Sequence, residues 1–246
     1  MNARSVFVGL ASIALLLVGP VALASATDVP STARSRAAVN RVQAGLASDL
    51  EDAGLRLGSP VFLRILKADE ELEAWVQGDG GRFVLFRTWP ICTFSGQLGP
   101  KTAQGDLQAP EGFYFVSPGR MNPASSFHLS FNLGYPNAYD RAHGRTGNYL
   151  MVHGSCASIG CYAMTDPVIE QIWTLMEKAF EGGQPFVRTH VFPFRMTDEK
   201  LAARADDPWA DFWGNLAEGW RAFEETKVPP NVRVEDKRYV FDRLEP

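Results

Sequence analysis

The stretch HGSCASIGCYAMTD, residues 153–166, holds one of the four histidines and two of the three cysteines in a chain of 246 residues. A histidine and cysteines this close together could bind a metal ion. Two cysteines could form a disulfide, and a cysteine beside a histidine could act as a nucleophile with its base. Three kinds of chemistry are therefore open for this stretch.

Zinc binding is the first alternative. His153, Cys156 and Cys161 have the spacing H-x2-C-x4-C, and His143 could supply a fourth ligand to a tetrahedral site. Structural zinc sites usually contain paired knuckles such as two C-x2-C units, and the sequence contains none. We therefore expect no metal and no other cofactor here.

A disulfide is the second alternative, and it would use Cys156. Its partner could be Cys92, which would leave Cys161 free, or Cys161 itself, which would silence that thiol. The sequence does not decide between them, because a bridge depends on the separation of the two Cα atoms. With an odd number of cysteines, at least one has no partner within the chain.

Nucleophilic catalysis by Cys161 is the third alternative. A thiol with a pKa of about 8.5 is mostly protonated at neutral pH, so it needs a histidine or a helix N-terminus beside it. His153 ends a short apolar segment, Gly160 forms a turn before Cys161, and a helix is expected to begin at Asp166. We expect Cys161 to be a thiolate paired with His153 that reacts well below pH 8.

The elements that must position this stretch indicate an α+β fold. Apolar segments bounded by turn residues predict strands, which cover residues 61–67, 71–77, 82–91, 113–116, 127–133, 148–154, 185–194 and 238–241. The segments between residues 95 and 148 are rich in glycine and proline, which is typical of functional loops.

Three helices are predicted from apolar residues at helical spacing. The first runs from a cap at Ser31 to a stop at Gly54, and the second from a cap at Asp166 to a stop at Gly182. The third, over residues 207–225, carries an aromatic stripe that indicates core packing rather than a ligand site.

The first 26 residues predict a secretory signal peptide. Arg4 precedes an apolar run over residues 6–18, and small residues end the segment at Ala26. The run is shorter than the roughly 20 residues that span a bilayer. We therefore expect an exported protein that is not stably inserted in a membrane.

The composition excludes some partners. The formal net charge is −4, and it becomes one unit more negative without residues 1–26, which contain Arg4 and no acidic residue. A mildly acidic protein has no electrostatic basis for binding nucleic acid. Its hydrophobic content of 46% is typical of a packed domain.

The motif and its neighbours resemble a known family. His153-Gly154, Ser158-x-Gly160-Cys161 and the following Met164 and Asp166 resemble the signature of the L,D-transpeptidase (YkuD-like) catalytic domain. The stretches FSGQLGPK, GDLQAPEGFYFV and NLGYPNAYDRAHGRTGNYLMVHG resemble its YafK-like branch in Gram-negative bacteria. The likeness implies a mainly β catalytic domain at 60–195, after a signal peptide at 1–26 and an N-terminal helical segment at 27–59, and before a C-terminal helical extension at 196–246.

The resemblance also implies roles for individual residues. Cys161 matches the nucleophile, His153 the proton donor and acceptor, and Gly154 the position whose carbonyl orients the imidazole. Gly160 and the N–H of Cys161 match the region that stabilises the oxyanion. Two further positions of the motif, Ser158 and Tyr162, are expected to contact substrate.

The sequence departs from the family pattern at two positions. Ile159 replaces a histidine, and Ala163 replaces an arginine. The polar role of that histidine is either missing or taken over by His143, and we expect Arg141 or Arg145 to hold an anionic group of the substrate. The spacing from histidine to cysteine is also shorter than is usual in the family, so we expect a reduced covering loop.

The expected function is that of a periplasmic cysteine enzyme acting on diaminopimelate in the stem peptides of peptidoglycan. An amine acceptor would make it a transpeptidase, with a second stem peptide or a lysine of an outer-membrane lipoprotein as partner. Water would make it a hydrolase that releases the attached group. The alternative from another class is a non-catalytic peptidoglycan-binding protein in which Ile159 and Ala163 mark lost activity.

Overall fold

The computed structural model describes Met1 and residues 28–246 of the chain. The predicted signal peptide, except for Met1, therefore lies outside the described residues. Within the described part, helices that combine the length and the apolar character needed to cross a bilayer are absent.

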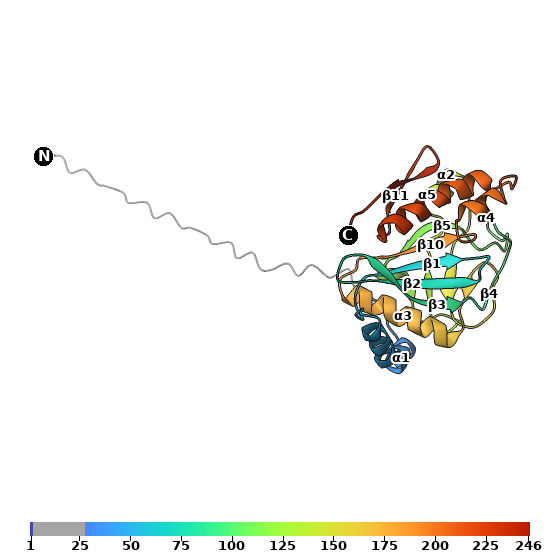
Figure 1. Cartoon of the computed structure of the whole chain (residues 1–246). Helices are drawn as coiled ribbons and strands as arrows, with labels where there is room; N and C mark the ends of the chain where they lie inside the picture. Colours follow the sequence, from blue (N-terminus) through green and yellow to red (C-terminus); the bar gives the residue numbers. More distant parts are fainter. Residues whose placement is uncertain (2–27) are drawn as a thin grey trace.

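A mixed sheet of five strands forms the centre of the molecule (Figure 1). The strand order is β3-β2-β1-β10-β5; β1 and β10 run parallel, and the other neighbours are antiparallel. The five strands are β1 (Val61–Leu66), β2 (Glu71–Gln77), β3 (Phe83–Pro90), β5 (Gly112–Val116) and β10 (Val187–Phe192).

Both faces of this sheet are covered, which explains why β1 is an almost continuous apolar run. Successive side chains of a strand point to opposite faces. Leu63 and Ile65 belong to the core cluster that contains α3 (Asp166–Glu181) and α1 (Ala33–Asp52), whereas Phe62 contacts Phe223 on the other side. Figure 1 shows α3 along one face of the sheet, α1 outside α3, and α5 along the opposite face.

A second sheet of five short strands carries the residues of the HGSC stretch. Its order is β4-β9-β8-β7-β6, and its side chains Phe131, Val152 and Tyr162 share the larger core cluster with the first sheet. The strands are β4 (Thr93–Phe94), β6 (Met121–Asn122), β7 (Ser130–Asn132), β8 (Met151–His153) and β9 (Tyr162–Ala163).

The predicted helix caps need correction at two sites. Thr32, not Ser31, caps α1: its hydroxyl accepts a hydrogen bond from the N–H of Ser35 at 3.2 Å. Thr165, not Asp166, precedes α3, so the Asp166 carboxylate is free to bind elsewhere. The predicted stop at Gly182 is confirmed as the C-cap of α3.

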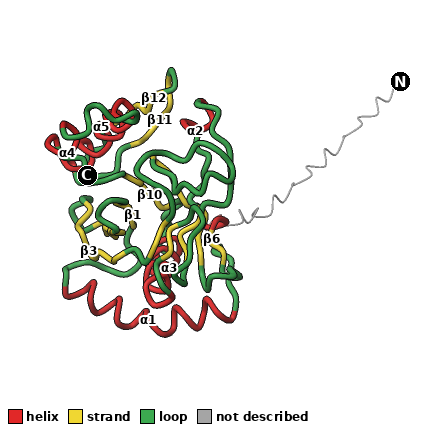
Figure 2. Tube along the Cα trace, turned by 90° about the vertical axis from the view of Figure 1, so that its right-hand side faces the viewer, coloured by secondary structure: helices red, strands yellow, loops and turns green. Residues whose placement is uncertain are grey.

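The C-terminal segment combines helices with a hairpin (Figure 2). It contains α4 (Asp198–Ala202), α5 (Ala210–Thr226) and the antiparallel pair β11 (Asn231–Glu235) and β12 (Arg238–Asp242). Strand β11 was not predicted, because its alternating exposed residues follow two prolines. A short helix, α2 (Ala138–Ala142), also lies in a segment that was predicted as a connection.

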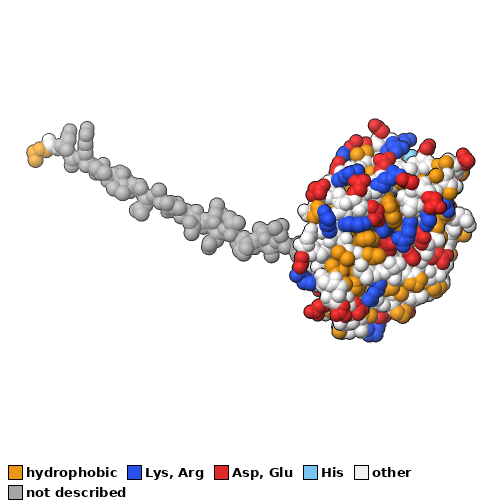
Figure 3. Space-filling view, in the orientation of Figure 1, with side chains coloured by type: hydrophobic (Ala, Val, Ile, Leu, Met, Phe, Trp, Pro, Cys, Tyr) orange, Lys and Arg blue, Asp and Glu red, His pale blue; other side chains and the backbone are white. Residues whose placement is uncertain are grey.

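The aromatic stripe of α5 packs into the core, as predicted. Its buried members are Phe212, Trp213, Leu216, Trp220 and Phe223. The surface outside the core mixes charges of both signs: Figure 3 shows basic and acidic side chains interspersed on the face that it displays.

Candidate active site

Strand register brings His153 and Cys161 to the same face of the second sheet. Strands β8 and β9 run parallel, with His153 opposite Ala163. Cys161 directly precedes β9, and its sulfur accepts a hydrogen bond from the N–H of Met151 at 3.4 Å. Ala163 is two residues beyond Cys161, so the side chains of Cys161 and His153 lie on the same face.

Both side chains line one cavity of about 390 Å³. This volume lies in the range of sites that bind small molecules and short peptide segments. Tyr149 and Ile159, with exposed fractions of 72% and 82%, form part of an apolar rim. The further lining residues include Lys101, Leu107, Asn122, Phe127 and Ser130.

The imidazole of His153 is held in one orientation. Its Nδ1 atom lies 2.6 Å from the carbonyl oxygen of Gly154, and the ring of Phe127 stacks on it with centroids 4.7 Å apart. A carbonyl can only accept a hydrogen bond, so Nδ1 carries the proton of the neutral ring and Nε2 keeps its lone pair. Burial lowers the pKa of His153, and the bond to Gly154 partly opposes this effect.

The thiol of Cys161 is partly buried in the cavity that this imidazole also lines. Burial raises its pKa, while the N–H of Met151 and the charge of Lys101 partly offset the rise. Both pKa directions favour a neutral thiol beside a neutral imidazole. These directions run against the expected resting thiolate, because desolvation penalises both charged forms.

A disulfide between Cys92 and Cys156 ties the loop after β8 to the end of β3, with 5.5 Å between the two Cα atoms. Cys161 is the free cysteine. The bridge decides between the two pairings left open by the sequence. It also contradicts the zinc alternative, because the sulfur of Cys156 is no longer available as a thiolate ligand.

Residues 154–161 leave the strand through a tightly packed turn. A Cβ atom on Gly154 would lie 2.6 Å from the Asp166 carboxylate and 2.9 Å from the carbonyl oxygen of Phe127. The same carboxylate accepts a hydrogen bond from the N–H of Ser155 at 2.7 Å. Gly160 has a φ of +130°, which L side chains rarely adopt. Both glycines are thus required by the backbone geometry around the thiol.

Ser158 and Tyr162 lie next to the site without lining the cavity. The Ser158 hydroxyl donates to the carbonyl of Cys161 at 2.7 Å and accepts from the N–H of Gly160 at 3.2 Å. Tyr162 is fully buried, and its hydroxyl donates to the carbonyl of Pro110 at 2.8 Å. Ser158 thus stabilises the turn before Cys161, and Tyr162 anchors β9. Neither side chain faces the cavity.

The residues of α2 and its flank do not reach the cavity. His143 Nε2 lies 2.8 Å from the carbonyl oxygen of Lys237 in the C-terminal hairpin. Arg145 is buried in an ion pair with Asp140 at 2.8 Å, and Arg141 donates to a backbone carbonyl of the preceding loop. His143 thus contacts the C-terminal hairpin and Arg145 lies over Phe212 of the C-terminal segment, whereas Arg141 contacts its own loop.

Most lining residues of the cavity were not identified from the sequence, and Asn122, Ser130 and Lys101 are among them. Asn122 on β6 lies opposite Ser130 on β7, and Ser130 lies opposite His153 on β8. Asn122, Ser130 and His153 therefore form one row across the sheet. The buried Ser130 hydroxyl has no hydrogen-bond partner among the described residues. Lys101 is buried against Asp106 near the thiol. The one available signal was a serine inside the apolar segment FHLSFNL.

Comparisons with known proteins point to one family. The family model described as "YkuD: L,D-transpeptidase catalytic domain" matches residues 63–192. The protein named "Putative L,D-transpeptidase YafK" from Escherichia coli (strain K12) is 44% identical over 187 residues, which are 76% of each chain.

Among solved structures, the helical cell shape determining protein Pgp2 from Campylobacter jejuni is similar with a TM-score of 0.43 and 19% identity, over 78% of this chain and 80% of that chain. Its K307A mutant is similar with a TM-score of 0.44 and 21% identity, over 71% and 62%. The structural likeness is weak, whereas the family model spans the strands that hold the cavity. On the strength of that model and of the 44% identity, the chain belongs to the L,D-transpeptidase (YkuD) family.

Proposed function

We propose that the protein is a periplasmic enzyme that opens a peptide bond at diaminopimelate in peptidoglycan stem peptides through a thioester on Cys161. The observation that carries this proposal is that the free thiol and an oriented imidazole line the same cavity. Membership in the family supports the substrate class.

The first half-reaction begins from the neutral pair. The Cys161 thiol passes its proton to Nε2 of His153 as its sulfur attacks the carbonyl carbon at the L-centre of diaminopimelate. Because Nδ1 donates to Gly154, the resulting imidazolium keeps a hydrogen bond that stabilises its charge. The N–H of Cys161 would stabilise the oxyanion. The carbon–nitrogen bond then breaks, and the imidazolium returns the proton to the leaving amine.

The second half-reaction regenerates the thiol. An amine or a water molecule gives a proton to Nε2 of His153 as it attacks the thioester carbonyl. The carbon–sulfur bond breaks, and the proton moves from the imidazolium to the sulfur of Cys161. An amine acceptor yields a new peptide bond, and water yields a free carboxylate.

The row of polar residues supplies a site for the substrate beside the nucleophile. A buried hydroxyl without a partner costs about 1–3 kcal/mol, so Ser130 is poised to bind a polar group that enters the cavity. Neighbouring strands are about 4.8 Å apart, which places this contact one strand from His153 and the Asn122 side chain two strands away. The apolar rim at Tyr149 and Ile159 would pack against the methylene chain of diaminopimelate.

Product analysis by mass spectrometry tests the proposal. Protein without residues 1–26 is incubated with purified muropeptides and, separately, with muropeptides that carry a linked lipoprotein fragment. The native protein should convert at least one substrate, while Cys161→Ser should convert neither and keep its fold by circular dichroism. Cross-linked dimers or amine exchange would identify transfer, and release of the linked group alone would identify hydrolysis. Absence of any Cys161-dependent product would favour a non-catalytic binding protein.

A further inference from the structure

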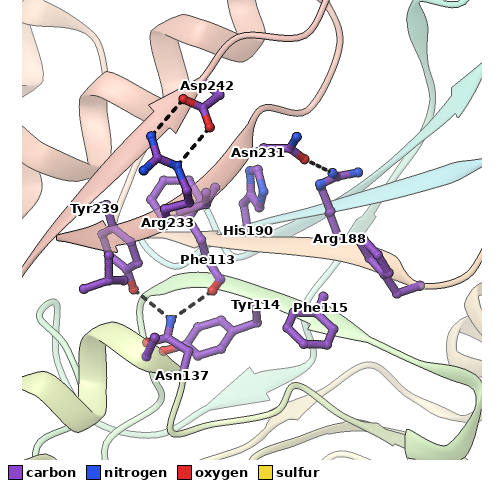
Figure 4. A pocket seen from close by; sticks show the side chains of 14 residues that line it. Phe113, Tyr114, Phe115, Asn137, Arg188, His190, Asn231, Arg233, Tyr239 and Asp242 are labelled. Carbon is purple, nitrogen blue, oxygen red and sulfur yellow. Dashed lines mark hydrogen bonds and ion pairs between the residues drawn. The ribbon is translucent and has the colours of Figure 1, made fainter.

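A second cavity, of about 440 Å³, lies between the first sheet and the C-terminal hairpin (Figure 4). Its lining shares no residue with the cavity around Cys161. One wall comes from β5 and β10, and the other from β11 and β12, which follow the region matched by the family model. The wall formed by β11 and β12 therefore lies outside the region that the family model matches.

Arg188 on β10 is the uncompensated charge of this cavity. Its guanidinium donates to the amide oxygen of Asn231 at 2.5 Å, and no described carboxylate forms an ion pair with it. Arg233 on the opposite wall differs, because Asp242 binds it at 3.0 and 3.1 Å. Figure 4 shows these two arrangements side by side. Burial lowers the pKa of Arg188, as expected for a desolvated cation without an anionic neighbour.

An aromatic surface lies beside this guanidinium. Phe115, which pairs with Arg188 across the two strands, is 50% exposed, and its ring centroid is 5.5 Å from that of Phe186. The guanidinium carbon of Arg188 lies 5.1 Å from the Phe186 centroid. Arg120, which is also without a carboxylate partner among the described residues, lies 4.7 Å from the Phe115 centroid. Phe115, Phe186 and Arg188 therefore face the same cavity, which Arg120 does not line.

A guanidinium has five N–H donors in a planar fork that matches a carboxylate. Arg188 uses one contact to Asn231, so most of its donors remain open to a ligand. Arg188 is half-buried, and a cation without an anionic partner beside exposed aromatic rings suits an anionic ligand with an apolar part. A peptide with free carboxylates and short alkyl side chains fits these requirements.

We propose that this second cavity binds a carboxylate-bearing stem peptide of the polymer, separate from the one that reacts at Cys161. This proposal rests on the proposed function for the choice of peptide. A carboxylate is held by Arg188, and the alkyl parts of the peptide pack on Phe115 and Phe186. Binding there would hold the enzyme on a multivalent substrate, because a second contact raises the effective concentration of the first.

The test is an NMR titration of the full mature chain in a Cys161→Ala background, which separates binding from turnover. The probe is the synthetic tripeptide alanyl-γ-glutamyl-diaminopimelate, and its comparator is the same peptide with every carboxylate amidated. The backbone signals of Phe115 and Phe186 should shift saturably with the acidic peptide and remain unchanged with the amidated one. Equal shifts with both peptides, or no shift at these signals, would overturn the proposal.

Matched variants locate the interaction. Arg188→Gln should weaken binding at this cavity at least tenfold, and Arg188→Lys should weaken it less, because the charge remains while the fork is lost. Arg233 lines the same cavity, but Asp242 already neutralises its charge. Arg233→Gln should therefore change the Kd of the peptide less than twofold. Equal weakening by Arg188→Gln and Arg233→Gln would refute a specific carboxylate site. Turnover of short muropeptides by Arg188→Gln protein with Cys161 intact reports on the proposed function separately.

Discussion

Removal of the Cys92–Cys156 disulfide is predicted to lower the stability of the protein substantially while sparing its chemistry. The two cysteines are separated by 64 residues, and this segment contains most of the second sheet. The chain-entropy relation for a closed loop of this length gives about 4 kcal/mol at 25 °C. For a domain of this size, that loss corresponds to a fall of about 8–16 °C in Tm.

The measurement compares native protein with Cys92→Ser/Cys156→Ser by equilibrium denaturation without reductant. Cys161→Ser is the matched control, because it removes a thiol without opening a bridge. The double variant should still turn over substrate at low temperature, since Ser155 remains bound to Asp166 at 2.7 Å. A loss of less than about 1 kcal/mol would refute the reasoning, because the bridge would then not constrain the denatured chain.

Three further predictions concern the catalytic pair. Gly154→Ala should lower kcat at least tenfold, with about 1–3 kcal/mol of destabilisation, because its Cβ would meet the Asp166 carboxylate at 2.6 Å; unchanged kcat in a steady-state assay would contradict this. Burial raises the pKa of Cys161 and lowers that of His153. The rate of alkylation of Cys161 by iodoacetamide should therefore rise only at pH values above the ordinary pKa of a thiol. A rate that is already constant below pH 7 would indicate a resting thiolate instead. Ser130→Ala should raise KM three- to tenfold or more without destabilising the protein, since it removes a buried hydroxyl that has no partner; a loss of stability with unchanged KM would assign a structural role.

The pH dependence of turnover follows from the same directions. Catalysis from the neutral pair requires His153 to be unprotonated, and burial lowers its pKa below the ordinary value of 6.5. The acid limb of kcat/KM should therefore lie below pH 6.5, and on the acid side activity should be lost as the pH falls through that limb. Because burial raises the pKa of the Cys161 thiol, the alkaline limb should lie above the ordinary thiol value.

The sequence was informative where local pattern determines structure. The apolar runs bounded by turn residues located β1, β2 and β10, and the helical spacing located α1, α3 and α5, because each of these elements buries much of its apolar surface. Short strands such as β6 and β9 have two residues each, so no periodicity could reveal them. They exist because their neighbours in the second sheet supply the hydrogen bonds.

The residues of the candidate site were likewise predictable only in part. His153 and Cys161 are eight residues apart, and their chemistry could be inferred from residue type and spacing. Lys101 and Ser130 reach the cavity only through long-range pairing of strands and loops, which the sequence does not encode locally. Arg145 was a plausible partner for an anionic substrate, yet the turn after α2 directs it to the buried Asp140 carboxylate.

The thioester on Cys161 is the central claim, and intact-protein mass spectrometry after rapid acid quenching tests it most directly. During turnover of muropeptides, native protein should gain the mass of the acyl group, and peptide mapping should place that mass on Cys161; Cys161→Ala should gain none. Product formation without an adduct at Cys161, or an adduct that persists in Cys161→Ala, would contradict the account.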